Sequence, residues 1–278
     1  MKCKITLKSY PLGDTIAAIP QVDKFQKLTG YEVGLFISDR YKSLFEKAYS
    51  NISFNPENFL FEKNIDIDFS FNQPLQKGYA DDLGMEYEEE TPKVYIPEDL
   101  QSPFPEKKYI TLSMQSTHQG RYWNNKNGWD FLIKYLKQKY NIHTVCIDRD
   151  AQWGVEKHYN LKPKKAIDRT GISLDKCIEY INNSLFHVGI STGLSWLAHA
   201  CGKHVVLVSN VTKHWYEFTH NTTRIYDESI CHGCLNEEQF DSSNWLWCPR
   251  KKNFECTKKI SFPVVKEKLD NLIKNNYS

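Results

Sequence analysis

Two periods of apolar and polar residues alternate along the chain, and together they predict an α/β protein. Short apolar runs are typical of buried strands, whereas apolar residues recurring at helical spacing are typical of helices that bury one face. The early part of the chain is predicted to contain strands 3–8, 31–38, 59–63 and 65–71 and helices 15–30, 41–50 and 77–84.

The same alternation resumes after a proline-rich break. Pro97, Pro103 and Pro105 lie close together, and we place the boundary there, which gives domains 1–106 and 107–278. Strands separated by single helices form parallel sheets, so we predict two Rossmann-like lobes that face a cleft. The second domain is predicted to contain strands 108–116, 142–150, 185–191 and 204–210 and helices 128–140, 173–184, 192–202 and 262–276.

Composition and charge restrict the function without identifying it. Of 278 residues, 40% are hydrophobic and 25% are charged, which is ordinary for a globular protein. The net charge of +2 does not require a nucleic-acid partner. The first residues lack the apolar run of a signal peptide, and no segment has the apolar length of a membrane span. We therefore expect a cytoplasmic protein with no membrane partner, whose thiols stay reduced.

Half of the eight cysteines lie in one short segment, and their spacing predicts a metal site. A Cys-x-x-Cys pair can place two thiolates on one ion, and Gly233 inside the pair permits the tight turn. Four thiolates suit Zn or Fe, so we interpret residues 231–256 as a metal finger. Reduced structural cysteines or a redox-active pair are the alternatives. The predicted ligands are Cys231, Cys234, Cys248 and Cys256.

The turn at Ser191, Thr192 and Gly193 joins a predicted buried strand to a helix, and it is typical of a phosphate site. The first turn of a helix presents unpaired backbone N–H groups and the positive end of the helix dipole. The hydroxyls of Ser191, Thr192 and Ser195 add donors, and Gly193 lets an anion approach closely. The alternative is an ordinary helix cap, since Ser and Thr are common capping residues.

The first lobe has a similar strand, glycine turn and helix, and its polar residue is Asp14. Open α/β sheets bind ligands at the carboxyl ends of their strands, so Asp14 is predicted to reach the cleft. A carboxylate there can act as a general base toward a hydroxyl. The alternative is that Asp14 only caps the helix.

Three more residues at the ends of second-lobe strands are candidates for donor binding. Arg121 can hold a diphosphate bidentately, although its aromatic neighbours are also typical of a core or an interface. Asp148 can accept a hydrogen bond from a ribose hydroxyl, with a surface turn as the alternative. Glu217 can bind a ribose or a base.

Together these motifs resemble a known enzyme family. The segments "GDTIAAIP" and "STGLSWLAHACGKHVVLVS" are similar to heptosyltransferases of the GT-B glycosyltransferase fold. Most of residues 107–260, including the cysteine segment with its Trp- and Phe-rich flanks, resembles the bacterial autotransporter heptosyltransferases. Those enzymes glycosylate protein hydroxyls and carry a four-cysteine iron-binding finger. The resemblance is looser over residues 1–100.

The resemblance implies roles for single residues. It makes Asp14 the base that takes the proton of the acceptor hydroxyl, and it places Arg121 where the family has a basic residue for the donor diphosphate. Thr192, Gly193 and Leu194 become the phosphate-binding helix start. The four cysteines become ligands of a structural Fe, with Zn as the alternative, and the donor becomes ADP-heptose.

The chain also departs from the family. Ser191 stands where the lipopolysaccharide heptosyltransferases usually have an Asp. The sequence begins almost directly with its first strand, whereas the autotransporter enzymes carry an N-terminal extension that helps to recognise the acceptor. A homo-oligomer is among the assemblies that we expect.

We therefore predict an inverting glycosyltransferase that moves a heptose-like sugar from a nucleotide-diphosphate donor to a macromolecule, with protein Ser or Thr favoured over DNA. The alternative is a phage-type DNA glycosyltransferase for hydroxymethylated bases, which needs a basic cleft with stacking aromatics. A third reading is a non-enzymatic binding module on a degenerate transferase fold. The residues that favour DNA are Lys107, Lys108, Arg121, Tyr122, Trp123, Lys126, Arg250, Lys251 and Lys252.

Overall fold

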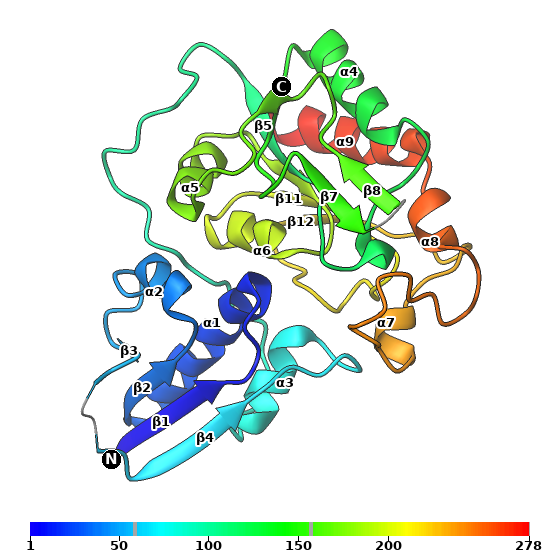
Figure 1. Cartoon of the computed structure of the whole chain (residues 1–278). Coiled ribbons are helices and arrows are strands. Elements are labelled where there is room, and N and C mark those ends of the chain that lie inside the picture. Colours follow the sequence, from blue (N-terminus) through cyan, green and yellow to red (C-terminus); the bar gives the residue numbers. More distant parts are fainter. Residues whose placement is uncertain (58–59, 156–157, 278) are drawn as a thin grey trace.

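A computed structural model of the chain describes residues 1–57, 60–155 and 158–277. It contains one parallel sheet in each half of the chain, as the alternation of strands and helices predicted (Figure 1). Over the described residues, no helix combines the length and the apolar content that crossing a bilayer requires.

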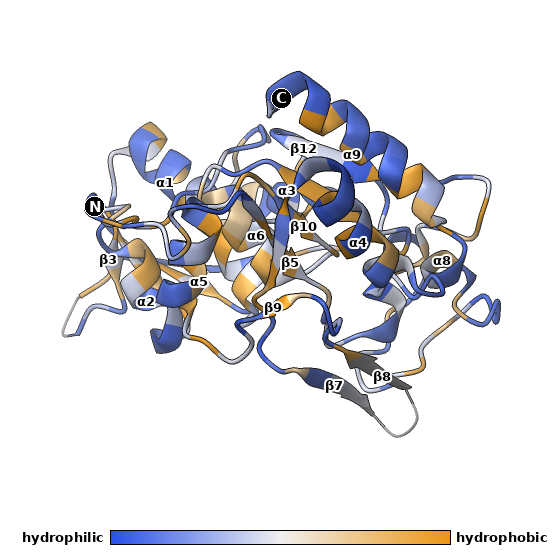
Figure 2. Cartoon of the chain, turned by 90° about the horizontal axis from the view of Figure 1, so that it is seen from above, coloured by the Kyte–Doolittle hydropathy of each residue, from blue (hydrophilic) through white to orange (hydrophobic). Residues whose placement is uncertain are grey.

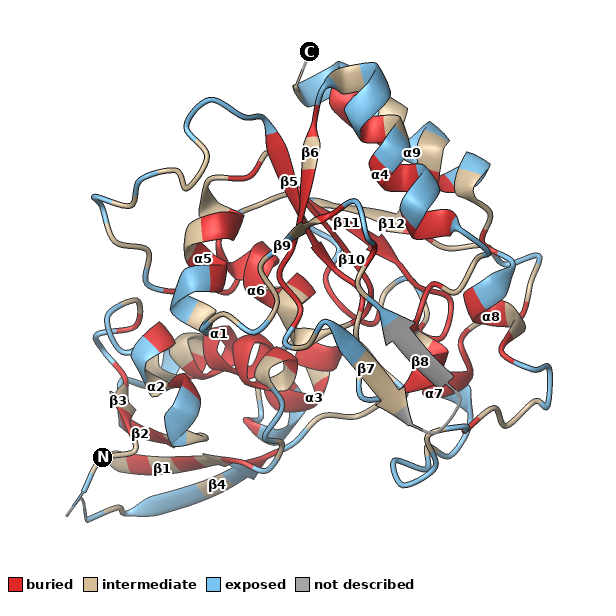
Figure 3. Ribbon diagram, turned by 45° about the horizontal axis from the view of Figure 1, so that its top comes forward, coloured by how far each residue is buried: buried red, intermediate tan, exposed pale blue. Residues whose placement is uncertain are grey.

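The first sheet has four strands in the order β3-β2-β1-β4, and three helices accompany it. Its central strands carry the apolar residues, whereas β4 is largely exposed and forms an edge (Figure 3). The strands are β1 (Lys2–Leu7), β2 (Glu32–Phe36), β3 (Ser53–Phe54) and β4 (Lys63–Ile67). The helices are α1 (Leu12–Thr29), α2 (Asp39–Phe45) and α3 (Leu75–Asp82).

The predicted elements of this lobe are largely confirmed, with two differences. Helix α1 ends as expected at Gly30, whose φ of 67° suits a residue without a Cβ. The predicted strand 59–63 is wrong over residues 60–62, and only its last residue, Lys63, is in a strand, where it begins β4 and pairs with β1. Phe59 lies outside the described residues. Strand β3 was missed, since two residues are too few to give a period.

The second sheet has six strands in the order β12-β11-β10-β5-β6-β9. Helices α5 and α6 pack against one face, and α4 and α9 pack together on the other. The strands are β5 (Tyr109–Ser113), β6 (His143–Cys146), β9 (Ile167–Asp168), β10 (His187–Gly189), β11 (Val205–Val208) and β12 (Thr222–Ile225). The long helices are α4 (Gly128–Tyr140), α5 (Leu174–Asn182), α6 (Gly193–Ala200) and α9 (Phe262–Asn276).

Both faces of this sheet are buried, which explains its continuous apolar strands. Along β11, Val205 and Leu207 join the cluster under α5 and α6, whereas Val206 and Val208 join the cluster under α4 and α9. Hydrophobic and hydrophilic residues share each of α4 and α9, so that one side of each helix meets the sheet (Figure 2).

Several short elements were not predicted because they carry no periodic pattern. An antiparallel hairpin projects beside the second sheet, and two single-turn helices lie in the cysteine-rich segment (Figure 1). These elements are η1 (Gln119–Arg121), β7 (Gln152–Val155), β8 (His158–Leu161), α7 (Cys234–Glu237) and α8 (Glu255–Lys258).

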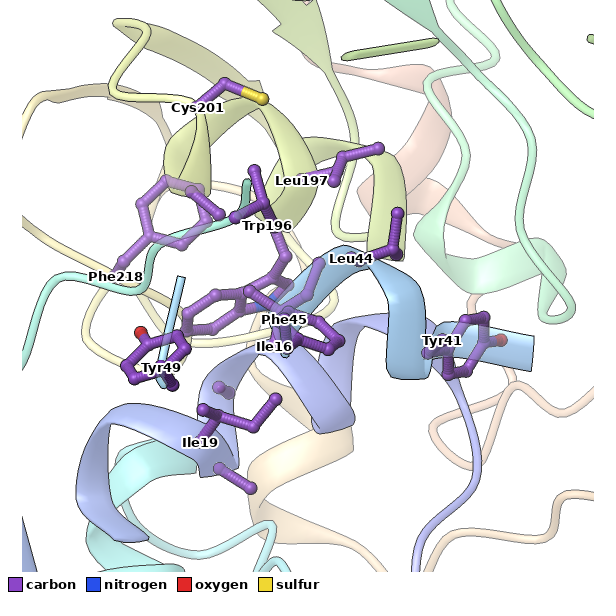
Figure 4. Close-up of a cluster of buried hydrophobic side chains, with 14 of the residues drawn as sticks. Ile16, Ile19, Tyr41, Leu44, Phe45, Tyr49, Trp196, Leu197, Cys201 and Phe218 are labelled. Carbon is purple, nitrogen blue, oxygen red and sulfur yellow. The ribbon is translucent and has the colours of Figure 1, made fainter. Parts of the chain in front are cut away.

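The two lobes share one apolar core, although a cleft between them was expected. Ile16 and Ile19 of α1 and Phe45 of α2 belong to the same buried cluster as Trp196 of α6 and Phe218 (Figure 4). The starts of α1 and α6 come so close that a Cβ on Gly193 would lie 2.9 Å from Leu12 Cβ and 3.0 Å from the backbone nitrogen of Gly13. Glycine is therefore required where the helices meet.

Candidate functional site

The loops that follow β1, β4, β5 and β10 meet between the two lobes. In the second sheet, β5 leads to α4 on one face and β10 leads to α6 on the other, so a switch point lies between these two strands. Open α/β sheets bind ligands just outside such points. In the first sheet α1 and α3 pack together on one face, and the loops after β1 and β4 meet the switch point of the second sheet at a cavity of about 70 Å³. It is lined by Pro11, Gly13, Asp14, Phe69, Phe71, Leu75, Arg121, Ser191, Thr192, Gly193, Trp196, Tyr216 and Glu217.

Asp14 is the carboxylate of this cavity. The N-cap of α1 is Pro11, and the Asp14 side chain accepts a hydrogen bond from the Ser9 hydroxyl, so Asp14 is no helix cap. Burial raises the pKa of Asp14, and the Ser9 hydrogen bond and the charge of Arg121 oppose that rise. Asp68 raises the pKa further by like-charge repulsion. A half-buried carboxylate with a raised pKa beside a cavity has the properties of a general base.

The start of α6 forms the opposite wall. Thr192 occupies the N-cap position with extended backbone angles, but its side chain makes no capping bond. Its Oγ1 is buried and has no hydrogen-bond partner among the described residues. The hydroxyl and the free backbone N–H groups of the first turn can therefore serve an anion in the cavity. Thr192 is therefore the N-cap by position but not through its side chain, and the anion site stays a prediction.

Arg121 brings the positive charge. It follows β5 in the short helix η1, and its Nη1 donates to the carbonyl oxygen of Ser191 at 3.2 Å. Its Nε is buried without a hydrogen-bond partner in the described part of the chain. Arg121 is thus anchored by one nitrogen across the switch point of the second sheet, and it keeps other N–H donors beside the start of α6.

Two predicted donor contacts lie elsewhere. Asp148 is fully buried, and its carboxylate accepts hydrogen bonds from the backbone nitrogens of Met114 and Gln115 at 3.0–3.2 Å. Burial raises its pKa to about 7. Ser195 is also buried, and its Oγ donates to the Ile190 carbonyl at 2.7 Å. Both side chains hold loop backbone, because each points into the protein from the end of its element.

The remaining predicted donor contacts are Glu217, which lines the cavity, and Leu194, which does not. Glu217 lines the cavity, but one carboxylate oxygen lies 2.5 Å from Arg224 Nη1 and the other accepts from Thr212 Oγ1 at 2.8 Å. Its charge is therefore already compensated. Leu194 packs half-buried against the shared core and is not among the lining residues.

Four residues of the site were missed in the sequence. Ser9 donates to Asp14, and Phe69, Phe71 and Tyr216 form an aromatic wall of the cavity. Strand periodicity could not identify them, because all four lie in loops beyond the strand ends. The "DFSF" pattern at the end of β4 was the only available signal, and it was read as strand.

The aromatics that favoured DNA do not face the cavity. Tyr122 and Trp123 are buried in the core beneath α4 and α9, and Trp123 Nε1 donates to the Ile260 carbonyl at 2.8 Å. Arg250 is ion-paired with Glu237 and Glu238. Tyr122, Trp123 and Arg250 are therefore not available for stacking on a base in this structure, and the DNA acceptor stays an alternative for the assay below.

The four clustered cysteines are all free thiols: Cys234 begins α7 and Cys256 lies in α8, whereas Cys231 lies in the loop before α7 and Cys248 in the loop between the two helices. Burial raises the pKa of Cys234 to about 12, and the charges of Cys231 and Cys248 contribute, so these sulfurs lie near one another. Among the described residues, however, no group of three or more Cys, His, Asp or Glu side chains has the arrangement of a metal site. The metal geometry expected from the sequence is therefore not shown. We call residues 231–256 the finger segment.

Comparison with known proteins gives a consistent result. No protein-family model matches the chain. It is 31% identical to the autotransporter heptosyltransferase Aah of Escherichia coli, over 94% of this chain and 72% of that protein. The crystal structure of the iron-containing dodecameric glycosyltransferase TibC from enterotoxigenic E. coli H10407 superposes with a TM-score of 0.91 and 28% identity, covering 99% of this chain and 76% of TibC. A TibC complex with ADP-D-β-D-heptose superposes with a TM-score of 0.89 and 27% identity, covering 99% and 77%.

Proposed function

This chain belongs to the autotransporter heptosyltransferase family, and from that premise we propose that it transfers a heptose from ADP-heptose to a Ser or Thr hydroxyl of a protein. That it is a glycosyltransferase follows from the family. The observation that carries the finer proposal is the pairing, across one cavity, of a carboxylate with a raised pKa and an anion site that holds an arginine.

The proposed reaction is one displacement at the anomeric carbon of the donor. The acceptor oxygen attacks this carbon, the bond from the carbon to the diphosphate oxygen breaks, and ADP leaves with the electron pair. Asp14 takes the proton of the acceptor hydroxyl, which makes the oxygen a better nucleophile. Attack from the side opposite the diphosphate inverts the configuration, so a β-linked donor gives an α-linked product.

The second lobe stabilises the leaving group. Negative charge grows on the diphosphate as the bond breaks, and groups that meet this charge lower the barrier. The N–H donors of Arg121, the hydroxyl of Thr192 and the start of α6 converge on one wall of the cavity. Asp14 lies on the opposite wall, in the place for an acceptor.

Donor binding requires the lobes to move apart. Sites that enclose ligands of this size measure about 300–1,000 Å³, far more than the cavity between the lobes. The starts of α1 and α6 are also packed so closely that a Cβ on Gly193 would lie 2.9 Å from Leu12 Cβ. We therefore assign the described conformation to a closed state.

The finger segment is proposed to bind iron through Cys231, Cys234, Cys248 and Cys256. The donor set fits, because four free thiols that sense one another's charge suit Fe or Zn. A metal held by four protein ligands has no open position, so it supplies folding stability to this segment. We expect about one iron per chain by elemental analysis, and loss of that iron in a Cys234→Ser variant. An iron-free wild-type protein with intact folding would contradict this assignment.

Dodecameric TibC leads us to propose a homo-oligomer here as well. Light scattering of the purified chain tests it, and a monomer at working concentration would contradict it.

The transfer reaction is tested by mass spectrometry. The purified protein is incubated with ADP-heptose, or with UDP-glucose as the matched donor control, and with two acceptors. One acceptor is a Ser/Thr-rich segment of an autotransporter, and the other is DNA that contains hydroxymethylcytosine. A heptose-sized gain on the peptide, α-linked by NMR, is expected. A gain on the nucleoside alone would replace the protein acceptor by DNA, and retention of the β configuration would remove the single displacement.

A further inference from the structure

The finger segment contacts both walls of the cavity, and these walls belong to different lobes. The loop from β4 to α3, which carries Phe71, extends toward α7 (Figure 1). Phe71, Phe240, Leu235 and Trp247 belong to a separate apolar cluster that also contains Cys234. The cysteine-rich segment of the second lobe is therefore packed directly on a cavity residue of the first lobe.

The polar part of this contact is made by one side chain. Asn236 of α7 donates from Nδ2 to the carbonyl oxygen of Phe71 at 2.5 Å. Its Oδ1 accepts the backbone N–H of Lys213 at 2.6 Å, from the loop that leads to Tyr216. Asn236 is buried, with 9% of its surface exposed. One amide thus joins the finger segment, the second lobe and the first lobe, with both of its ends bonded.

The apolar part reaches the other wall. The Phe240 ring lies 5.4 Å from the Phe71 ring and 5.2 Å from the His118 ring, measured between centroids. The Trp247 ring packs on His118 as well, at 5.5 Å. His118 stands just before η1, which carries Arg121. Phe240 therefore lies between the aromatic wall of the first lobe and the loop that positions the arginine of the second.

We propose that the finger segment clamps the two walls of the cavity against each other, with Asn236 and Phe240 as positioning residues for acceptor binding. The proposal rests on the proposed function, because it assigns Phe71 to the acceptor side of the transferase site. A clamp of this kind sets the distance between the acceptor wall and the donor wall without touching either substrate.

A substitution at Asn236 can break its hydrogen bond to the first lobe while keeping its hydrogen bond to the second lobe. Asn236→Asp keeps the oxygen that accepts from Lys213 and loses the donor to Phe71, so only the bond between the lobes is broken. We expect the KM for the acceptor peptide to rise about tenfold, while the KM for ADP-heptose changes less than about twofold. Phe240→Ala removes contacts with both walls and is expected to raise both KM values.

Two control variants address general effects of substitution. Asn244→Ala changes an exposed asparagine of the same segment, whose side chain bonds only within its own turn. Phe131→Ala removes a half-exposed ring of α4. Iron content is measured in every variant, because a clamp variant must keep the iron of the wild type. Equal acceptor KM values in Asn236→Asp and Asn244→Ala would overturn the proposal.

Hydrogen exchange gives a readout that does not depend on turnover. The amide of Leu75 donates to the Tyr216 carbonyl across the lobes at 2.9 Å, so its protection reports the clamp. We expect faster exchange over residues 69–75 in Asn236→Asp and unchanged exchange in α4. Unchanged protection of residues 69–75 in Asn236→Asp would refute the clamp, whether or not the wild type transfers sugar. Failure of the wild type to transfer sugar would count against the proposed function alone.

Discussion

The start of α1 and the start of α6 are built alike and carry opposite chemistry. Each follows a central parallel strand, each has a glycine in its first turn, and the two glycines are in contact. Asp14 stands in the first turn of α1, whereas Thr192, with Arg121 beside it, stands at the start of α6. One backbone arrangement therefore presents a carboxylate in one lobe, the proposed proton acceptor, and a hydroxyl beside an arginine in the other, the proposed anion site.

The difference shows that a strand–turn–helix unit positions side chains at the end of a sheet, and that the residue types in the turn determine the chemistry. Helix N-termini favour negative charge, so α1 and α6 would both suit an anion. In α1 that position is already taken by a carboxylate of the chain itself, which is held by Ser9. In α6 no such carboxylate is present in the first turn, and the buried Thr192 hydroxyl has no partner among the described residues, which is why we propose a ligand anion there. The substitutions that follow test this contrast.

The largest effect is expected for Asp14→Asn, which removes the base and keeps the shape. We expect kcat to fall by about 10²–10⁴-fold with little change in ADP binding. Asp68→Asn is the matched control, since Asp68 is an exposed neighbour at the end of β4 and should change kcat by less than about threefold. If the two variants lose equal activity, the base is not Asp14.

The wild type should also lose activity toward acid. The reaction needs ionised Asp14, and burial raises its pKa, so the active form disappears as pH falls through that raised value. The acidic limb of kcat/KM is expected above about pH 3.9, where an exposed Asp titrates. A flat acidic limb in Asp14→Asn would complete the assignment.

The second effect in size is expected on the opposite wall. Arg121→Ala should lower kcat/KM by about 10²-fold, because the growing charge on the diphosphate loses its cation. Arg121→Lys keeps the charge without the planar fork and should be intermediate. Steady-state kinetics with ADP-heptose measure both. Full activity of Arg121→Ala would leave the helix start as the sole anion site.

The contact between the starts of α1 and α6 is tested by adding a methyl group to each of its two glycines. Gly193→Ala would place a Cβ 2.9 Å from Leu12 Cβ, and we expect a loss of about 1–3 kcal/mol in the free energy of unfolding. Gly13→Ala should cost less, because its nearest atom would be Trp196 Cδ1 at 3.1 Å. Urea denaturation compares the two variants. Negligible costs in both variants would mean that the lobes lie farther apart in solution.

The smallest effect is expected for Ser9→Ala. Removing a hydrogen bond to the ionised carboxylate should raise the pKa of Asp14 further and move the acidic limb to higher pH. We expect kcat at neutral pH to fall by no more than about tenfold. Ser9→Thr keeps the hydroxyl and should restore the wild-type profile. An unmoved limb in Ser9→Ala would leave Ser9 with no part in tuning the base.

The amino-acid sequence alone was enough to predict the two parallel sheets and most long helices. Apolar periodicity is a local property of the sequence. A strand buried on both faces, such as β11, is predicted from its unbroken apolar run. The glycine turns before α1 and α6, with Asp14 and Thr192, were visible for the same reason. The sequence left two interpretations open for each of these residues, a helix cap or a functional site, because both use the same residue types.

Tertiary structure showed that neither the Asp14 nor the Thr192 side chain makes a helix-capping hydrogen bond, and it added contacts that no local pattern carries. Asp148 and Ser195 looked equal to Asp14 and Thr192 in sequence, yet the fold turns their side chains inward to hold loop backbone. Contacts between residues far apart in the chain, such as Ser191 with Arg121 and Phe71 with Asn236, depend on how the sheets face each other. Strand order and lobe packing fix these pairs, and neither is encoded in the period of any single segment.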